Sequence, residues 1–252
     1  MKKVLSILGV FAFFFATAVA ATHSKHAATA IEASVSFAAI AGIGGVSPRK
    51  LFDDLRQKYG ENRVVTPAEL RAEVVMVNGQ ADYLFSFYKV PGESVTEKKL
   101  KFQDKFLAYK LGLFLMAEPI AVPGIGKLET YPNPIVFPDE SGQLQNAHLE
   151  VIYNGHFSFK VGDTTYIDDF PTRDCREVNT AQKASGVANS ERHPHNGFID
   201  LIGNITLIGS ENQDLRLTIP ANNAQKVQST AGAYLVKLVC ILNGFKVTGA
   251  GK

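Results

Sequence analysis

Two groups of side chains in this sequence could do chemistry, and both lie in its C-terminal half. The members of the first group are Asp174, Glu177, Glu191, His193 and His195. Imidazole and carboxylate together form the ligand set of many zinc sites. The two histidines are separated only by a proline, which makes them hard to direct at one ion, and no third histidine stands at a matching spacing. We therefore interpret this stretch as a solvated loop, with metal binding as the less favoured alternative.

The second group consists of Asp163, Asp168 and Asp169. Neighbouring carboxylates bind calcium, and a pair of them performs the acid and base steps of glycoside hydrolysis. The stretch lacks the regular Asp-x-Asp-x-Asp-Gly order of a calcium loop, and the two-carboxylate mechanism requires a separation that sequence does not give. A polar turn is the favoured interpretation.

Other catalytic signatures are missing from the chain. It contains no G-x-S-x-G, no H-E-x-x-H and no convincing pairing of a cysteine with a histidine. The glycine-rich stretches at Gly42 and Gly124 lack the context of a phosphate-binding loop. Cys175 and Cys240 cannot form a metal site alone, and both a disulfide and two separate thiols are compatible with the sequence. We predict no catalytic, cofactor-binding or metal-binding residues, and hence no enzyme.

Composition restricts the class of protein. The chain has 252 residues, and 26 basic residues stand against 24 acidic ones, which gives a formal net charge of +2. This balance lacks the concentrated positive field of a nucleic-acid binder, so no specific nucleic acid is expected as a partner. Apolar residues make up 46% of the chain, enough for a substantial core.

Residues 1–20 have the pattern of a secretory signal. Two lysines precede an apolar run, and small residues that include Ala18 and Ala20 follow where cleavage would occur. A retained hydrophobic segment that contacts a membrane is the alternative, because the run is short for a spanning helix. Residues 21–47 are apolar and rich in alanine and glycine, and they predict a flexible arm.

Residues 48–65 predict one short amphipathic helix and a connection. Ser47 is a suitable N-cap, Pro48 suits the first helical position, and Gly60 suits the end of the helix. The apolar residues that fall on one helical face are Leu51, Phe52, Leu55 and Tyr59. No other segment predicts a helix as clearly.

From residue 66 onward the sequence predicts strands. Asn78-Gly79, Asn154-Gly155 and Asn243-Gly244 each stand between apolar-rich runs, the strongest short-range signal for a turn between paired strands. The run 106–116 is almost continuously apolar, which is typical of a strand buried on both faces.

Alternation is clearest in the segment 149–170. Phe157, Phe159 and Val161 alternate with polar residues, as in a strand with one buried face, and Gly162-Asp163 supplies the next turn. Together with the preceding Asn-Gly pair, this predicts a meander in which two hairpins share a central strand.

Two long loops, 119–148 and 172–197, interrupt the strands. The first contains five prolines, and so long a connection inside a domain usually marks a contact or a functional element. We count nine or ten strands and no alternation with helices. The predicted fold is all-β: an antiparallel sandwich or jelly roll over 66–252, with an N-terminal arm and one short helix.

The C-terminal half resembles the β-sandwich coat proteins of tailless bacterial viruses in strand texture and loop placement. The stretches that carry the resemblance, within 66–249, are "LETYPNPIVF", "LEVIYNGHFSFKVGDTTYIDDFPT", "LRLTIP" and "LNGFKVTG". The resemblance implies a jelly-roll subunit that self-associates into a shell and catalyses nothing. A cleavable signal departs from this family, whose shells assemble in the cytoplasm.

The leading functional hypothesis is a non-enzymatic, capsid-like structural subunit whose partner is itself and whose location is the virion. Edge strands, an arm and long loops suit self-assembly into a homo-oligomer. The alternative is an exported β-sandwich binding module, secreted, periplasmic or at the cell surface, with membrane contact through the N-terminal segment. A secreted hydrolase is third, and it requires His193, His195 and Asp168 to meet in one pocket.

Overall fold

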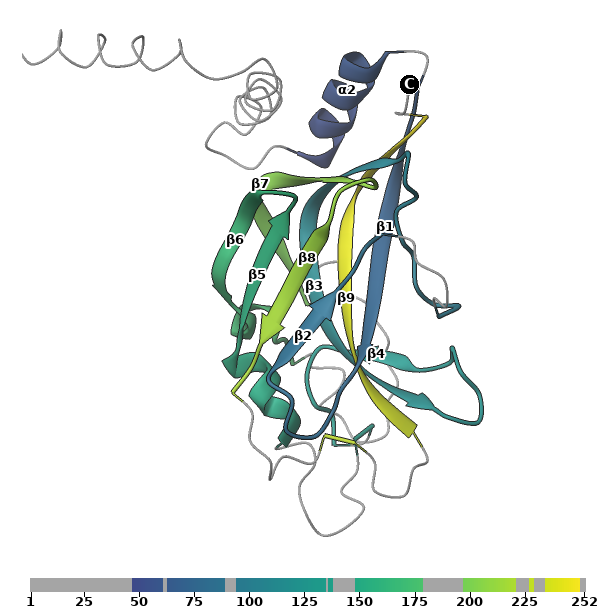
Figure 1. Cartoon of the computed structure of the whole chain (residues 1–252). Coiled ribbons are helices and arrows are strands. Elements are labelled where there is room, and N and C mark those ends of the chain that lie inside the picture. The colour runs from purple at the N-terminus through teal and green to yellow at the C-terminus, as the bar shows by residue number, and fades with distance from the viewer. Residues whose placement is uncertain are drawn as a thin grey trace, which may run out of the picture. The chain divides into compact units, whose positions relative to one another are not determined.

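The structure is a computed structural model that describes most of the chain from Ser47 onward. The described residues are 47–60, 63–88, 94–134, 136–137, 148–178, 197–220, 227–228 and 234–249. The signal-like segment 1–20 and the arm predicted over 21–47, apart from Ser47, lie outside the described residues. Figure 1 shows the helix and the strands of the described part.

The predicted helix is present as α2 (Pro48–Tyr59). The Ser47 hydroxyl accepts a hydrogen bond from the backbone N–H of Lys50 at 3.3 Å, which satisfies one of the free donors of the first turn. The apolar face of the helix is buried, and the Phe52 ring lies 5.5 Å from that of Phe245 near the end of the last strand. The helix thus covers one end of a sheet.

Nine strands form two antiparallel sheets within the described residues (Figure 1). The five-stranded sheet runs in the order β1 (Val64–Val75), β9 (Tyr234–Thr248), β3 (Lys105–Pro119) and β4 (Lys127–Glu129), and β7 (Phe198–Ile208) also pairs with β3. The four-stranded sheet runs in the order β2 (Asp82–Phe85), β8 (Gln213–Thr218), β5 (His156–Val161) and β6 (Thr164–Pro171). The prediction of an all-β fold with antiparallel sheets and one helix is confirmed.

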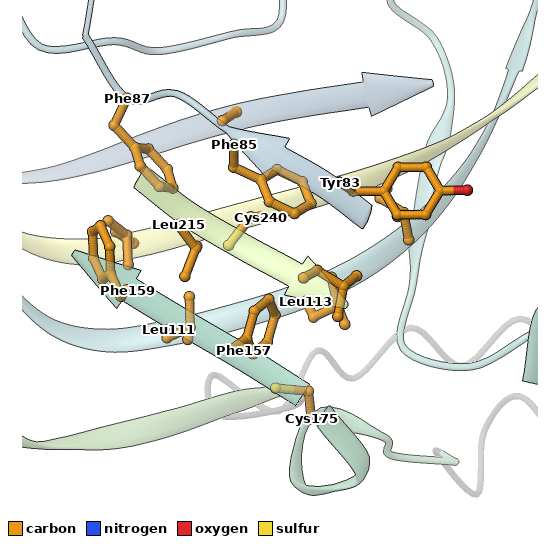
Figure 2. Close-up of a cluster of buried hydrophobic side chains, with 14 of the residues drawn as sticks. Tyr83, Phe85, Phe87, Leu111, Leu113, Phe157, Phe159, Cys175, Leu215 and Cys240 are labelled. Atoms are coloured by element: carbon orange, nitrogen blue, oxygen red, sulfur yellow. The ribbon is translucent and has the colours of Figure 1, made fainter. Parts of the chain in front are cut away.

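The main core lies between the two sheets (Figure 2). Phe157 and Phe159 on β5 are fully buried, whereas Lys160 is exposed, so the alternation predicted for this strand is confirmed. The core residues labelled in Figure 2 are Tyr83, Phe85, Phe87, Leu111, Leu113, Phe157, Phe159, Cys175, Leu215 and Cys240.

Strand β3 is buried on both faces, as its almost continuous apolar run predicts. Leu113 and Leu115 belong to the main core, whereas Phe114 and Met116 on the opposite face pack with Val239 of β9 in a smaller apolar cluster. Such a strand has no solvent-facing side on which polar residues could alternate.

The turn predicted at Asn78-Gly79 is present, but the strands on either side of it are not a hairpin. β1 pairs with β9 and β2 pairs with β8, so the chain crosses from one sheet to the other at this turn. Gly79 has the positive φ, 77°, that a tight turn favours. The free edge of β1 is partly occupied by Lys98, whose backbone exchanges hydrogen bonds with Arg71.

The turn predicted at Asn243-Gly244 is wrong, because both residues lie inside β9. A Cβ at Gly244 would lie 2.1 Å from the carbonyl oxygen of Leu107 on β3. The pairing of β3 with β9 shifts by one residue at Tyr109 to form a bulge at this point. The glycine is required by close approach of two backbones, and its neighbour Asn243 is an ordinary strand residue.

The first hairpin predicted in the 149–170 segment is also wrong. Residues before Gly155 form η1 (Glu150–Asn154), a short 3₁₀ helix, and the partner of β5 on that side is β8. Ile152 and Tyr153 are both buried, and adjacent residues cannot both face the core from a regular strand. The second hairpin, β5–β6 with its turn at Gly162-Asp163, is confirmed.

Candidate functional site

The structure separates the three aspartates that sequence groups together. Asp163 lies in the β5–β6 turn, as predicted, whereas Asp168 and Asp169 lie inside β6, at the edge of the sheet. The interpretation of these two as turn residues is wrong, because β6 continues through them as a bulge in which Asp169 has a φ of 58°. The Asp169 Oδ1 atom lies 3.7 Å from Nδ1 of His156 on β5.

A groove of about 270 Å³ lies between β6 and β7. The apolar residues that line it are Tyr166, Ile167, Phe170, Pro171, Ile199, Leu201 and Ile205. Asp168, Asp169 and Asp200 add three exposed carboxylates, of which Asp200 lies 3.5 Å from the Lys110 ammonium. We name this site the β6–β7 groove. Among the residues that the structure describes, no three His, Cys, Asp or Glu side chains are grouped to hold a metal ion.

Only the two ends of the histidine-containing loop are described. His193, His195 and Glu191 lie outside the described residues. Asp174 is exposed in η2 (Thr172–Cys175), and the Glu177 carboxylate accepts a hydrogen bond from the backbone N–H of Gly197 at 2.9 Å. Glu177 therefore ties together the two ends of the loop, which is a structural role.

Both cysteines are free thiols buried in the core (Figure 2). Cys175 ends η2 and Cys240 lies in the middle of β9, and neither is exposed. Burial raises the pKa of Cys175 to about 12 and raises that of Cys240 as well. A nucleophilic cysteine needs an accessible thiolate, so these two act as small apolar residues.

Four charged side chains, buried or largely buried, lie together on the face of the five-stranded sheet opposite the main core. Arg71 and Glu73 come from β1, Glu118 from β3 and Lys237 from β9. Glu73 lies 2.8 Å from Arg71 and 3.1 Å from Lys237, and Lys237 also pairs with Glu118. The Glu73 and Glu118 side chains are only 3% and 5% exposed. We name these four residues the charged cluster.

The charged cluster holds ionised groups despite its burial. Burial disfavours the carboxylate of Glu118, but hydrogen bonds from Lys237 and from the Gly124 N–H outweigh it, so the pKa of Glu118 lies below its ordinary value. Burial similarly disfavours the Lys237 ammonium, but Glu118 and Glu73 outweigh it and raise the pKa of Lys237. Each ion is stabilised by its partners, as buried ion pairs require.

Two loops are fastened to this cluster. The Thr96 hydroxyl donates a hydrogen bond to Glu73, and the backbone N–H of Gly124 donates one to Glu118 at 2.8 Å. The carboxylate of Glu97 accepts from the N–H groups of Ser94 at 3.0 Å and Glu73 at 3.1 Å. The cluster therefore fixes the loop before β3 and the loop after it.

The β3–β4 hairpin ends in exposed apolar residues. Ile120, Val122 and Ile125 are 49%, 52% and 62% exposed, and Val95 in the neighbouring loop is fully exposed. We name residues 120–125 the hairpin tip. Apolar side chains gathered at the end of a fixed loop, rather than scattered singly, usually mark a contact site.

Sequence reasoning marks the hairpin tip only broadly and misses the charged cluster. The tip falls inside the Pro-rich loop 119–148 that the sequence predicts as a contact element. The cluster joins positions from Arg71 to Lys237, and nothing in the local sequence of a charged residue shows that distant strands will bury it. Only strand pairing brings the four residues together.

Comparisons with models of protein families, with curated proteins and with solved structures find no match to this chain. Within the described part of the chain, no helix combines the length and the hydropathy of a membrane span. The strand arrangement and the surfaces described above are therefore the features that bear on function.

Proposed function

We propose that the chain is a non-enzymatic structural subunit that self-assembles into a capsid- or coat-like homo-oligomer. The observation that carries the proposal is the order of the strands. Without the three-residue β4, eight strands remain, and each sheet contains four of them. One sheet has the order β1-β9-β3-β7, and the other has the order β2-β8-β5-β6.

This order supports a jelly roll. Numbered along the chain without β4, the first, eighth, third and sixth strands form one sheet, and the second, seventh, fourth and fifth form the other. Two Greek keys folded over each other produce such an order, and viral capsid subunits are among the proteins built in this way. Lectins and cupins share the architecture, so the fold alone does not decide the function.

The state of the ionisable groups favours a structural role. The buried carboxylates of Glu73 and Glu118 are neutralised by Arg71 and Lys237, and the buried thiols are protonated. Catalytic acids and bases instead sit in clefts with a pKa near the working pH. The carboxylates at the β6–β7 groove are exposed to solvent instead. An apolar groove with a charged rim suits binding between subunits.

The test is the assembly state of the full chain. We expect the purified protein to form a discrete particle in sedimentation velocity experiments and in negative-stain electron microscopy. A single species of 27.4 kDa at every concentration, salt and pH tested would contradict the proposal. Denatured and refolded protein serves as the control, because a specific assembly re-forms with the same size.

A second candidate, an exported or cell-surface β-sandwich binding module, is favoured by two observations. One is the signal-like pattern of residues 1–20, and the other is the β6–β7 groove, which has the concave apolar form of a binding site. Intact mass of the protein from its source separates the candidates. A monomer that begins near Ala21 supports the module, whereas an uncleaved chain in a particle supports the structural subunit.

A further inference from the structure

We propose that the hairpin tip of one copy inserts into the β6–β7 groove of a second copy. The inference deepens the proposed function and rests on it, because it names the contact by which subunits would associate. Each surface thereby has one partner: the groove of one copy receives the tip of another copy.

The hairpin tip is built as a rigid projection. Glu118 holds the backbone of Gly124 through a hydrogen bond of 2.8 Å, and Glu118 is itself paired with Lys237 below the surface. A Cβ at Gly126 would lie 2.6 Å from the Met116 side chain, so the returning strand lies close against β3. A projection fixed before binding loses little conformational entropy on contact, which makes the exposed Ile and Val residues effective anchors.

The groove has the size and chemistry to accept these side chains. An apolar cavity of about 150 Å³ is sufficient for a benzene molecule. The β6–β7 groove measures about 270 Å³ and therefore has room for two branched aliphatic side chains. Its apolar lining would cover the exposed side chains of Val122 and Ile125. The lining includes Ile167, Phe170, Ile199 and Leu201.

The charges of the two surfaces are complementary. The segment 119–127 contains no acidic residue and ends in the exposed Lys127. The groove instead presents the carboxylates of Asp168, Asp169 and Asp200. Opposite charges around an apolar contact fix its register and suppress wrong partners, so Lys127 approaching this acidic rim would orient the inserted tip.

The two surfaces also lie where a single copy cannot join them. In Figure 1, β6 and β7 form one flank of the strands, and the β3–β4 hairpin projects beyond the opposite flank. Because the two surfaces lie on opposite flanks, one such contact leaves a free groove on one copy and a free tip on the other, and this head-to-tail arrangement produces rings or extended assemblies. Each copy then offers one tip and one groove, as a repeating shell or lattice requires.

Cross-linking of the full chain tests this contact. The double variant Val122→Cys/Asp168→Cys is treated with a short bis-maleimide, while the buried Cys175 and Cys240 stay unreactive. We expect a ladder of covalent multimers on a denaturing gel, and each single variant to give dimers at most. The control is Phe102→Cys/Asp168→Cys, since Phe102 is 73% exposed and lies outside the tip. Equal ladders from both double variants, or no ladder from assembled protein, would overturn the inference.

Assembly of charged variants provides the second arm. We expect Val122→Asp to weaken self-association at least tenfold in sedimentation experiments and Phe102→Asp to leave it unchanged, with melting temperatures showing that both fold. Normal assembly of Val122→Asp overturns the inference. Binding of the wild type to phosphatidylcholine vesicles also overturns it if Val122→Asp abolishes that binding and Phe102→Asp does not, because a lipid surface would then be the partner of the tip. If the wild type never assembles, the proposed function itself fails. If the wild type assembles and Val122→Asp assembles equally well, the inference fails while the proposed function stands.

Discussion

Glu118 accepts a hydrogen bond from the backbone N–H of Gly124 at 2.8 Å, so a side chain near the end of β3 fixes the loop that follows it. The same carboxylate pairs with Lys237 on the neighbouring strand. An exposed apolar loop is thereby connected to the most deeply buried charges of the sheet. The charged cluster thus holds this exposed loop in shape, which is what the proposed contact requires of it.

Removal of the Glu118 charge tests this connection. Glu118→Gln leaves Lys237 with Glu73 as its remaining carboxylate, so we expect a loss of about 3 kcal/mol in the free energy of unfolding, at the lower end for a broken buried ion pair. Urea denaturation measures the loss. The control, Glu69→Gln, breaks the exposed pair with Lys98 at 3.2 Å and is expected to cost less than about 1 kcal/mol. Equal losses in the two variants would contradict a special role for the cluster.

The same residue predicts how stability depends on pH. Burial raises the pKa of Glu118, but its hydrogen bonds outweigh burial and hold the pKa in the folded state below the ordinary 4.5. Its contribution is therefore present above pH 4.5 and is lost as the pH falls through the folded-state value. We expect the stability difference between wild type and Glu118→Gln to be constant from about pH 6 to about pH 9 and to shrink below about pH 4.5.

Lys237 determines the behaviour at the alkaline end. Burial lowers its pKa, but Glu118 and Glu73 outweigh burial and raise it, so its contribution is complete below the ordinary 10.5 and is lost above that value. If the difference in the free energy of unfolding between wild type and Glu118→Gln already falls between neutral pH and about pH 9, this assignment is contradicted. Denaturation curves at matched ionic strength provide the measurement, because salt screens the surface charges and barely affects buried pairs.

Local patterns in the sequence were sufficient for the elements that local physics determines. Ser47 and Pro48 start α2 where the capping chemistry predicts it, and Phe157 and Phe159 face the core of β5 as their alternation predicts. The apolar run in β3 likewise predicts a strand covered on both faces. In each case, the residues that carry the signal are the residues that make the contact.

Those local patterns do not predict which distant strands pair with each other. Asn78-Gly79 makes the predicted turn, yet its two strands join different sheets because β9 and β8 are their partners. Asn243-Gly244 is the same dipeptide but makes no turn. Its glycine is needed because the backbone of Leu107 lies too close for a Cβ atom. The β6–β7 groove and the charged cluster depend on such long-range pairing, so neither was predicted as a site.

Gly244 provides a direct test of this distinction. Gly244→Ala places a methyl group 2.1 Å from the Leu107 carbonyl oxygen and 2.7 Å from the Phe106 ring, and two central strands would have to separate. We expect a loss of about 3 kcal/mol in the free energy of unfolding, the upper part of the usual range for overpacking. Asn243→Ala is the control, because Asn243 is an ordinary strand residue and the loss there should be under about 1 kcal/mol. If Asn243-Gly244 formed a turn, no backbone would crowd a Cβ at position 244, and the two losses would be similar, about 1 kcal/mol each, because both turn positions need a positive φ.

The two thiols give a test of the core that requires no substitution. Burial raises the pKa of Cys175 to about 12 and that of Cys240 as well, so both are protonated and inaccessible at neutral pH, and the thiolate is the reactive form. We expect the native full chain to leave an aromatic disulfide reagent unreacted for hours at pH 8, and two thiols per chain to react in guanidinium. One thiol that reacts quickly in the native protein would contradict the burial of Cys175 in η2 or of Cys240 in β9. No reactive thiol in guanidinium, with an intact mass lower by two hydrogens, would instead show a disulfide, the bond that an oxidising compartment would favour.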